Sequence, residues 1–170
     1  MRTRSSKKKR WILPAVAAVL LTSLIVSYAS YLRIHVGSGG VSAFERALTE
    51  AVRSQEPFQM QEVTDFEWDR MIIGYPYMSK EELEAAAGVR WTNRTYPGYL
   101  LERYVLKDLM GDLILSDESV NKVVFISGGK VVLETTLYRD QADFTGIKGT
   151  VTPERDEFKA EGPVLHLLSE

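Results

Sequence analysis

The 170-residue chain contains no cysteine. Without a thiol, the chain has no disulfide, no zinc–thiolate or iron–sulfur cluster and no thiolate nucleophile. The acylated cysteine that anchors bacterial lipoproteins is excluded as well. Any attachment to a membrane therefore has to come from another part of the chain.

Acidic residues are missing before Glu45, whereas six basic residues lie within the first ten positions. After position 33 the chain carries 14 basic and 23 acidic residues, a balance of −9. A domain with this charge repels phosphate backbones and anionic headgroups, so we predict no nucleic-acid partner.

Charge of either sign is missing from positions 11–32, which read WILPAVAAVLLTSLIVSYASYL. At the helical rise this run spans roughly 33 Å, about the thickness of a hydrocarbon core. We predict a transmembrane signal anchor at 11–32 that inserts into the lipid bilayer. The basic residues 1–10 precede it, so the positive-inside rule keeps the N-terminus in the cytoplasm and places the following domain outside the cell. The alternative is a signal peptide cleaved near Ala29, which would release a secreted domain.

The rest of the chain predicts one extracytoplasmic domain at 42–170, joined to the anchor by a linker at 33–41. The expected fold is α+β, a small, mostly antiparallel sheet with two or three helices packed on one of its faces. The apolar run within Trp68–Tyr75 is typical of a central strand buried on both faces. Gly128-Gly129 between two apolar runs predicts a hairpin, because glycine readily takes the positive φ angles of a two-residue turn.

Two serine-x-x-glutamate patterns predict helix N-termini, one at Ser42 with Glu45 and one at Ser79 with Glu82. Gly88 is expected to end the second helix. Weaker patterns predict strands at 58–61, 90–91 and 164–168, a helix at 100–111 and a helix start at 152–154.

Signatures of known catalytic sites are also missing. The chain has no Gly-x-Ser-x-Gly elbow, no His-Glu-x-x-His pair, no phosphate-binding glycine loop and no dinucleotide fingerprint. His166, between two leucines, fits a strand better than a catalytic base. The spacing of Asp65, Glu67 and Asp69 is similar to a calcium loop, but Arg70 occupies the position that needs glycine. We predict no catalytic residue, no cofactor and no metal site, and we do not expect an enzyme.

The segment DFEWDRMIIGYPYMSK, residues 65–80, contains the candidate binding residues. Asp69 stands at the edge of the apolar run, where a carboxylate can be partly buried and paired. Tyr75 and Tyr77 flank Pro76, and tyrosine is common at recognition surfaces. The competing interpretation makes the segment a folding nucleus, in which the tyrosines cover the core and Asp69 makes a structural ion pair or turn contact.

Several short motifs follow one another in a recognisable order. They are Phe66-x-Trp68-Asp69, Pro76-Tyr77-x-Ser79-Lys80-Glu81-Glu82, Gly88, Trp91, Val123-Val124-Phe125-Ile126, Gly129-Lys130-Val131-Val132, Arg139 and Asp143-Phe144. On these residues, about half of the chain resembles uncharacterised membrane-anchored or lipoprotein-type extracytoplasmic proteins of Gram-positive bacteria. The resemblance implies an envelope domain and supplies no activity. Because this chain lacks the lipoprotein cysteine, its helix is expected to be the anchor.

Together these patterns favour a non-enzymatic binding or accessory module of the cell envelope, with an envelope protein or a cell-wall component as its partner. One alternative is a carboxylate-dependent cell-wall hydrolase, with Asp69 as the best single candidate. Another is an envelope-sensing regulator, which is disfavoured because ten cytoplasmic residues are too few to hold a partner domain.

Overall fold

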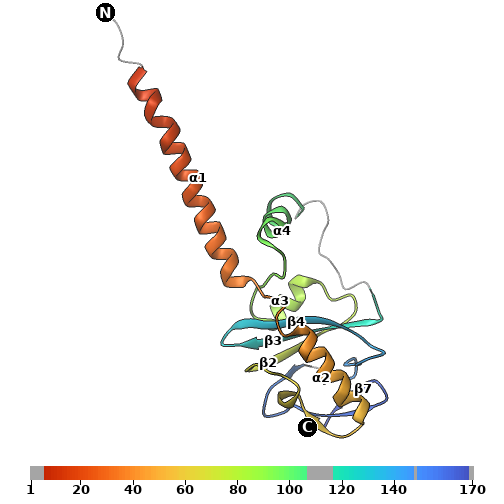
Figure 1. The fold of residues 1–170 in the computed structure, drawn as a ribbon. Helices are drawn as coiled ribbons and strands as arrows, with labels where there is room; N and C mark the ends of the chain where they lie inside the picture. Colours follow the sequence, from red (N-terminus) through yellow and green to blue (C-terminus); the bar gives the residue numbers. More distant parts are fainter. Residues whose placement is uncertain (1–5, 107–116, 148, 169–170) are drawn as a thin grey trace, which may run out of the picture. The chain divides into compact units, whose positions relative to one another are not determined.

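The computed structural model describes residues 6–106, 117–147 and 149–168. Its helices are α1 (Ser6–Ile34), α2 (Val41–Ser54), the 3-10 turn η1 (Met60–Glu62), α3 (Lys80–Ala87), α4 (Tyr96–Leu101) and the π-helical turn η2 (Glu102–Leu106) (Figure 1). Its strands are β1 (Phe58–Gln59), β2 (Arg70–Gly74), β3 (Val120–Ser127), β4 (Lys130–Tyr138), β5 (Thr150–Val151), β6 (Glu157–Glu161) and β7 (Val164–Leu167). The class is α+β, as predicted. The chain divides into two compact units, with the boundary between Ile34 and His35.

The first unit is the helix α1. By length and composition, its segment Pro14–Ile34 is apolar enough to cross a membrane, a property that anchors and signal sequences share. The helix starts at Ser6, earlier than position 11, because lysine and arginine are good helix formers. The hydroxyls of Thr22, Ser23 and Ser30 each donate to the carbonyl four residues earlier at 2.9 Å. These polar side chains are therefore satisfied within the helix, as an apolar environment requires.

The second unit is built around a four-stranded antiparallel sheet with the order β4-β3-β2-β5. β2 lies between two other strands and all its residues after Arg70 are buried, which confirms the predicted central strand. β3 and β4 form the predicted hairpin, with Gly128 at φ 55° and Gly129 at φ 73°. Both positive angles are those that a primed two-residue turn needs.

A β-bulge interrupts the pairing of β3 and β4 close to this turn. Phe125 pairs with Leu133, but Ile126 pairs with Val131. Val132 is therefore an extra residue in β4, which is one of the two outermost strands of its sheet. Such a bulge bends the strand and increases its twist.

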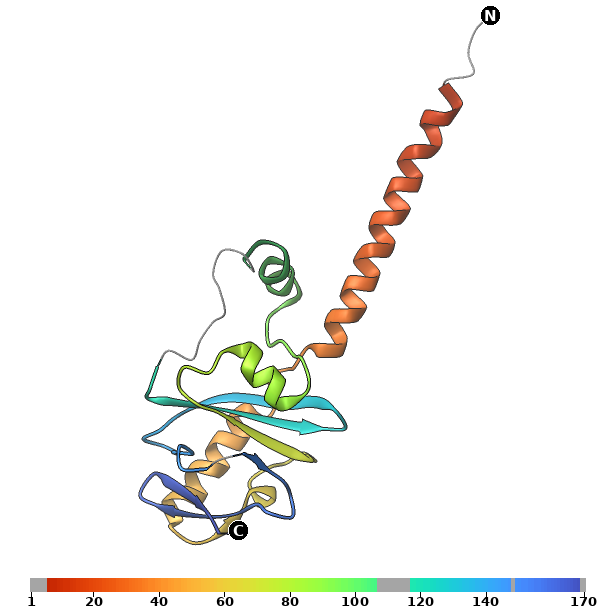
Figure 2. The same cartoon turned by 180° about the vertical axis from the view of Figure 1, so that it is seen from behind.

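Both faces of the four-stranded sheet are covered by apolar cores. The larger core lies between the sheet, α2 and a second, smaller sheet, and includes Phe44, Leu48, Met71, Val123, Phe125, Phe158 and Leu165. The smaller core lies on the other face, where α3 and Trp91 cover the sheet, and includes Ile72, Leu83, Ala87, Val124 and Ile126. The expectation that the helices pack on one face is therefore wrong, because α2 and α3 lie on opposite faces (Figures 1 and 2). Apolar residues alternate between the two cores along β2 and β3, so both faces of these strands had to be buried.

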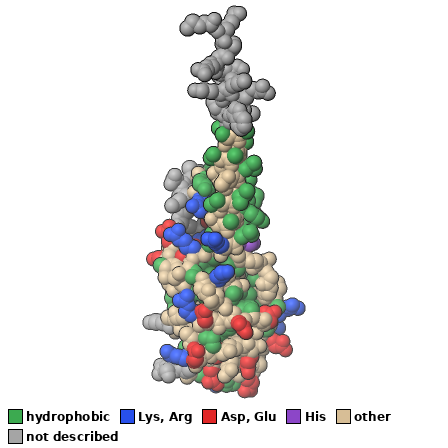
Figure 3. Space-filling model, turned by 90° about the vertical axis from the view of Figure 1, so that its left-hand side faces the viewer, with side chains coloured by type: hydrophobic (Ala, Val, Ile, Leu, Met, Phe, Trp, Pro, Cys, Tyr) green, Lys and Arg blue, Asp and Glu red, His purple; other side chains and the backbone are tan. Residues whose placement is uncertain are grey.

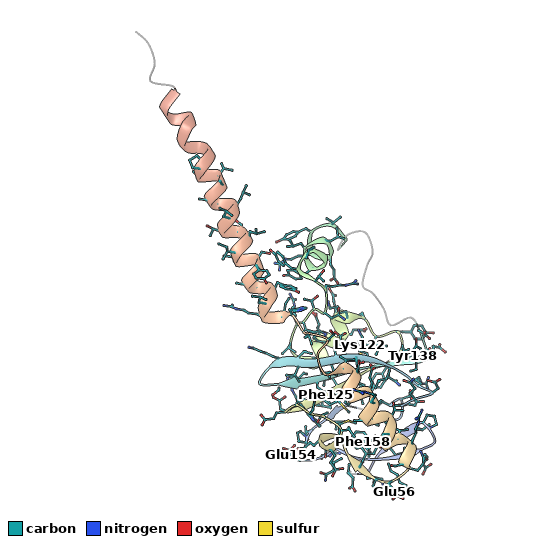
Figure 4. The ribbon with its side chains drawn as sticks, in the orientation of Figure 1. Glu56, Lys122, Phe125, Tyr138, Glu154 and Phe158 are labelled. Carbon is teal, nitrogen blue, oxygen red and sulfur yellow. The ribbon has the colours of Figure 1, made fainter. Side chains whose placement is uncertain are left out.

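Phe125 occupies the centre of the larger core and is fully buried. The rings of Phe44, Phe66 and Trp68 meet it edge-on, with centroid distances of 5.1, 5.3 and 5.4 Å. Figure 4 labels Phe125 on the four-stranded sheet and Phe158 on the smaller sheet, and both belong to this core. The aromatic residues of segment 65–80 thus contribute to the folding of the domain.

The smaller sheet is antiparallel, has the order β1-β6-β7 and closes the larger core. The carboxylate of Asp156 accepts a hydrogen bond from the backbone N–H of Gln61 at 2.9 Å. The backbone N–H of Asp143 donates to the carbonyl of Pro163 at 2.7 Å, and that of Leu165 donates to the carbonyl of Asp143 at 2.9 Å. The first bond joins η1 to the residue before β6, and the other two join the chain that follows β4 to the start of β7.

The start and end of α3 agree with the sequence. The hydroxyl of Ser79 accepts from the backbone N–H of Glu82 at 3.1 Å, and the carboxylate of Glu82 accepts from the N–H of Ser79 at 2.8 Å. Gly88 ends the helix at φ 68°. The predicted capping box and glycine stop are confirmed.

The start of α2 differs from the prediction. Gly40, at φ 84°, is the N-cap, so the helix begins two residues earlier than a cap at Ser42 allows and has no side-chain cap. Glu45 instead accepts a hydrogen bond from the hydroxyl of Thr135 on β4 at 2.6 Å. The predicted capping box is wrong because a tertiary contact takes the glutamate that would have completed it.

The weaker predictions have mixed outcomes. The strand at 164–168 is confirmed as β7, and that at 58–61 shortens to β1 followed by η1. Residues 90–91 form no strand, although Thr92 makes an isolated bridge with His35. The predicted helix start at Thr152 is a turn closed by a bridge to Arg155. The helix predicted at 100–111 is present as α4 and η2 up to residue 106, and residues 107–111 lie outside the described residues.

Candidate functional site

The candidate residues Asp69, Tyr75 and Tyr77 lie at the two ends of β2. Asp69 immediately precedes the strand, whereas the two tyrosines follow it. The strand between them spans roughly 13 Å at the usual rise per residue. The structure therefore does not bring Asp69 together with the tyrosines.

Asp69 is part of the hairpin connection. Its Oδ2 accepts from the backbone N–H of Gly128 at 2.8 Å, and its Oδ1 lies 3.6 Å from Nε of Arg70. Its backbone N–H donates to the carbonyl of Ile126 at 2.8 Å. These contacts fasten the start of β2 to the turn between β3 and β4, with the carboxylate about half exposed.

Tyr75 covers the larger core. Its ring is partly buried against that core, and its hydroxyl donates to the carbonyl of Ile147 at 2.7 Å. Both parts of the side chain are engaged in holding the fold together.

Tyr77 differs from its neighbours in backbone and exposure. Its φ angle is 68°, in the left-handed region that favours glycine, and its side chain is 59% exposed. Its hydroxyl donates a short hydrogen bond to the carboxylate of Glu118. The hydrogen bond to Glu118, followed by partial desolvation and the negative charge of that carboxylate, raises the pKa of Tyr77. The phenol therefore remains a protonated hydrogen-bond donor at neutral pH.

A second exposed tyrosine lies near the same end of the sheet. Tyr138, the last residue of β4, pairs with Val120 and is 58% exposed (Figure 4). Glu118 precedes Val120 by two residues, and its carbonyl accepts from Nη1 of Arg139 at 3.0 Å. Tyr77 bonds to Glu118 just before β3, and Tyr138 stands opposite the first residue of β3, so we call these three residues the tyrosine patch.

An ion pair between Arg139 and Asp143 stabilises the turn that follows β4, next to Tyr138. Asp143 is 9% exposed and accepts from Nη2 of Arg139 at 2.9 Å. The backbone N–H and the hydroxyl of Thr145 also donate to it, at 2.9 and 2.5 Å. Burial raises the pKa of Asp143, but the hydrogen bonds from Arg139 and Thr145 outweigh it, so the pKa lies below its usual value. An ionised Asp143 thus holds the turn that follows β4.

A second, partly buried ion pair lies on the face of the sheet that α3 covers. Glu134 has a side chain only 7% exposed, and its Oε1 lies 2.6 Å from Nζ of Lys122. Its other oxygen accepts from Nε1 of Trp91 at 2.8 Å. Both carboxylate oxygens therefore have partners, which a buried charge requires.

The other titratable side chains of the described residues do not suggest a metal site. Among the described residues, no group of three or more histidine, aspartate or glutamate side chains could hold a metal ion. His166 lies 3.8 Å from Glu161 in the hairpin of β6 and β7, and both side chains are exposed. The predictions of no metal and no catalytic residue remain predictions.

Sequence reasoning did not single out Glu118, Tyr138 or Glu134. The register set by the hairpin turn was the one available signal, since it pairs Tyr138 with the start of β3. The contact between Tyr77 and Glu118 joins residues 41 positions apart, and no local spacing rule predicts it. The geometry described above is the basis for assigning a function, because no protein-family model, curated protein or solved structure matches this chain.

Proposed function

We propose that the protein is a single-pass membrane protein whose domain, residues 35–170, lies outside the cytoplasm and binds an envelope partner without catalysing a reaction. The apolar helix Pro14–Ile34 supports the anchor, and the basic residues 1–10 support its orientation. The resemblance to uncharacterised envelope proteins of Gram-positive bacteria agrees with this proposal and stays a prediction.

One observation carries the binding proposal: Tyr77 places a bulky, exposed ring on a left-handed backbone. Any residue with a β-carbon is strained there, whereas glycine is not. The ring belongs to neither apolar core, so packing does not offset the strain. Strained residues cluster at functional sites. We therefore assign the ring of Tyr77 to partner binding.

The chemistry of the tyrosine patch defines the partner. Tyr77 and Tyr138 offer rigid apolar area with hydroxyl groups, which is typical of residues that dominate protein interfaces. Glu118 adds a carboxylate to the same patch. The best match is a protein surface that presents an apolar side chain next to a lysine or arginine.

Site-specific photocrosslinking tests the binding proposal in intact cells. A photoreactive amino acid replaces Tyr138 in the full-length chain, and adducts are compared with and without the substitution Tyr77→Gly. We expect a discrete protein adduct that Tyr77→Gly abolishes, because glycine relieves the backbone strain and removes the ring. The matched control carries the photoreactive group at Val132, which is exposed on the same strand.

The outcomes separate the possible partners. An adduct that survives Tyr77→Gly, or that forms equally from Val132, contradicts a specific tyrosine patch. An adduct with cell-wall polymer in place of protein identifies the other class of partner. Tyr77→Phe keeps the ring and removes the hydroxyl, so it shows whether the bond to Glu118 contributes.

The absence of cysteine makes the location directly testable. A single Leu168→Cys substitution at an exposed site is expected to react with a membrane-impermeant maleimide in intact cells, and Thr3→Cys is expected to be protected. The reverse pattern contradicts the proposed orientation. Recovery of the labelled domain from the medium shows cleavage near Ala29 in place of anchoring.

A further inference from the structure

The outer edge of β4 presents a row of backbone groups that face away from the sheet. Antiparallel strands alternate between residues whose backbone groups face the neighbouring strand and residues whose backbone groups face away from it. The backbone N–H of Arg139 donates to the carbonyl of Ser119 at 2.8 Å, so Arg139 faces the chain that leads into β3. The alternation then turns the N–H and C=O groups of Glu134, Thr136 and Tyr138 away from β3.

Among the residues that the structure describes, one of these outward groups has a partner. The carbonyl of Tyr138 accepts from the backbone N–H groups of Gln141 and Ala142, at 3.0 and 3.1 Å. The N–H and C=O groups of Glu134 and Thr136, and the N–H of Tyr138, make no hydrogen bond to any described residue. Thr136 and Tyr138 are also exposed to solvent. Unpaired groups at strand spacing are complementary to the backbone of another extended chain.

The open stretch of this edge is short. At its start the chain's own linker comes close, because a β-carbon at Gly40 would lie 3.9 Å from Cδ1 of Leu133. At its end, the carbonyl of Tyr138 closes the following turn. The stretch Glu134–Tyr138 between these limits spans roughly 14 Å, which is enough for an extended segment of about five residues.

Carboxylates are in excess at the end of this stretch. The two strand ends around Tyr138, residues 117–122 and 134–143, contain five acidic and two basic residues. Both basic side chains already have carboxylate partners, Glu134 and Asp143, at 2.6 and 2.9 Å. The three carboxylates outside these ion pairs belong to Asp117, Glu118 and Asp140. A segment that carries lysine or arginine is therefore attracted to this end of β4, and an acidic segment is repelled.

The charge of the whole domain disfavours a second copy at this edge. The balance of −9 after position 33 means that two copies repel each other. Figure 4 labels Tyr138 on the right-hand side of the domain, and Figure 3 shows the left-hand side, where basic side chains lie among acidic ones. The end of β4 at Tyr138 therefore attracts a basic partner more strongly than that mixed face does.

We propose that an extended segment of the partner protein adds to the sheet along Glu134–Tyr138, with a lysine or arginine opposite Tyr138. Its backbone pairs with the N–H and C=O groups of Glu134 and Thr136 and with the N–H of Tyr138. Its basic side chain lies over the ring of Tyr138, beside the carboxylate of Glu118. This inference rests on the proposed function and defines how the partner meets the tyrosine patch.

Photocrosslinking of the full-length chain in intact cells tests strand addition. The photoreactive amino acid at position 138 is combined with either Thr136→Pro or Thr136→Val. Proline removes the N–H that faces away from β3, and an edge strand tolerates proline at such a position. Valine keeps this N–H and a branched side chain. We expect the adduct to fall about tenfold or more with Thr136→Pro and to stay within about twofold with Thr136→Val.

A second pair of variants keeps the test decisive if urea unfolding shows that Thr136→Pro destabilises the domain. Thr136→Lys places a positive charge beside the bound basic segment, and Thr136→Glu places a negative charge there. We expect the adduct to fall severalfold with Thr136→Lys and to persist with Thr136→Glu. Mass spectrometry of the adduct is expected to locate the crosslink next to a lysine or arginine of the partner.

The outcomes separate this inference from the proposed function. If Tyr77→Gly abolishes the adduct but neither Thr136→Pro nor Thr136→Lys weakens it, strand addition is refuted and the tyrosine patch stands. Equal losses with Thr136→Pro and Thr136→Val also refute strand addition, because valine keeps the backbone group. If no adduct forms from position 138, the proposed function is refuted and this inference with it. If the adduct contains only this chain, a second copy occupies the edge and the assignment to a basic partner is overturned.

Discussion

Replacing Lys122 with methionine is expected to destabilise the domain more than replacing its partner Glu134 with glutamine. At 2.6 Å and an effective dielectric constant of about 20, the attraction between the two charges is about 6 kcal/mol, which desolvation of both groups largely offsets. Lys122→Met leaves a carboxylate that is only 7% exposed without its counter-charge, so the expected loss is about 3–5 kcal/mol.

Glu134→Gln has a smaller expected cost. The side chain of Lys122 is 24% exposed, so its ammonium can be hydrated, and an amide oxygen at position 134 still accepts from Trp91. The expected loss is about 1–2 kcal/mol, the usual range for one hydrogen bond. In the double variant Lys122→Met/Glu134→Gln, the carboxylate that Lys122→Met would leave unpaired is replaced by a neutral amide. The double variant is therefore expected to be more stable than Lys122→Met alone.

Urea unfolding of the full-length protein in detergent, followed by tryptophan emission, measures these differences. Trp91 reports the site directly, and Trp68 reports the opposite core. Equal slopes in urea across the four proteins show that the unfolding transition itself is unchanged. The control Lys130→Met, at an exposed position in the hairpin, is expected to stay within about 0.5 kcal/mol of the wild type. The reasoning would be refuted if the double variant lost the sum of the two single-variant losses in unfolding free energy. It would also be refuted if Lys122→Met alone lost less than about 1 kcal/mol.

Three further outcomes are expected. Asp143→Asn should cost about 2 kcal/mol at neutral pH, because it removes a charge-assisted hydrogen bond. Since the pKa of Asp143 is lower in the folded than in the unfolded chain, its stabilisation is complete above about pH 4 and is lost as the pH falls through the folded value. Urea unfolding measured from about pH 2 to about pH 7 should therefore show that the free energy of unfolding falls less steeply with decreasing pH in Asp143→Asn than in the wild type. An equally steep fall in both proteins would contradict this. Phe125→Ala should cost about 3–5 kcal/mol in the same unfolding assay, because it empties the centre of the larger core. Tyr77→Gly should leave the urea midpoint unchanged or raise it, since the strained backbone is relieved, and a clear loss of stability would make Tyr77 a structural residue.

The parts of the fold that could be predicted from the sequence depend on contacts between near neighbours. The capping box at Ser79 and Glu82 and the turn at Gly128-Gly129 each form within a few residues, and the structure contains both. β2 was also identifiable, because a strand buried on both faces needs an uninterrupted apolar run. The face that each helix covers was predicted wrongly, since an apolar stripe does not state which core it joins.

The failures involve longer contacts or very short elements. Glu45 bonds to Thr135, 90 residues away, and this contact competes with the local cap expected at Ser42. β1 and β5 contain two residues each, too few to show any periodicity. At the tyrosine patch, the sequence indicated Tyr77 as a candidate but gave no sign of its strained backbone or of its partner Glu118.

The bulge at Val132 has a consequence for the open edge of the four-stranded sheet. An outermost strand is an open template on which a second chain can pair, and under the proposed anchoring copies in the same bilayer would meet at high local concentration. The extra residue twists β4 and shifts its hydrogen-bonding groups out of step, and Lys130 places a charge at its start. A neighbouring copy therefore cannot add its own β4 along the full length of the strand. A single extra residue thus disfavours the joining of these domains edge to edge into continuous sheets.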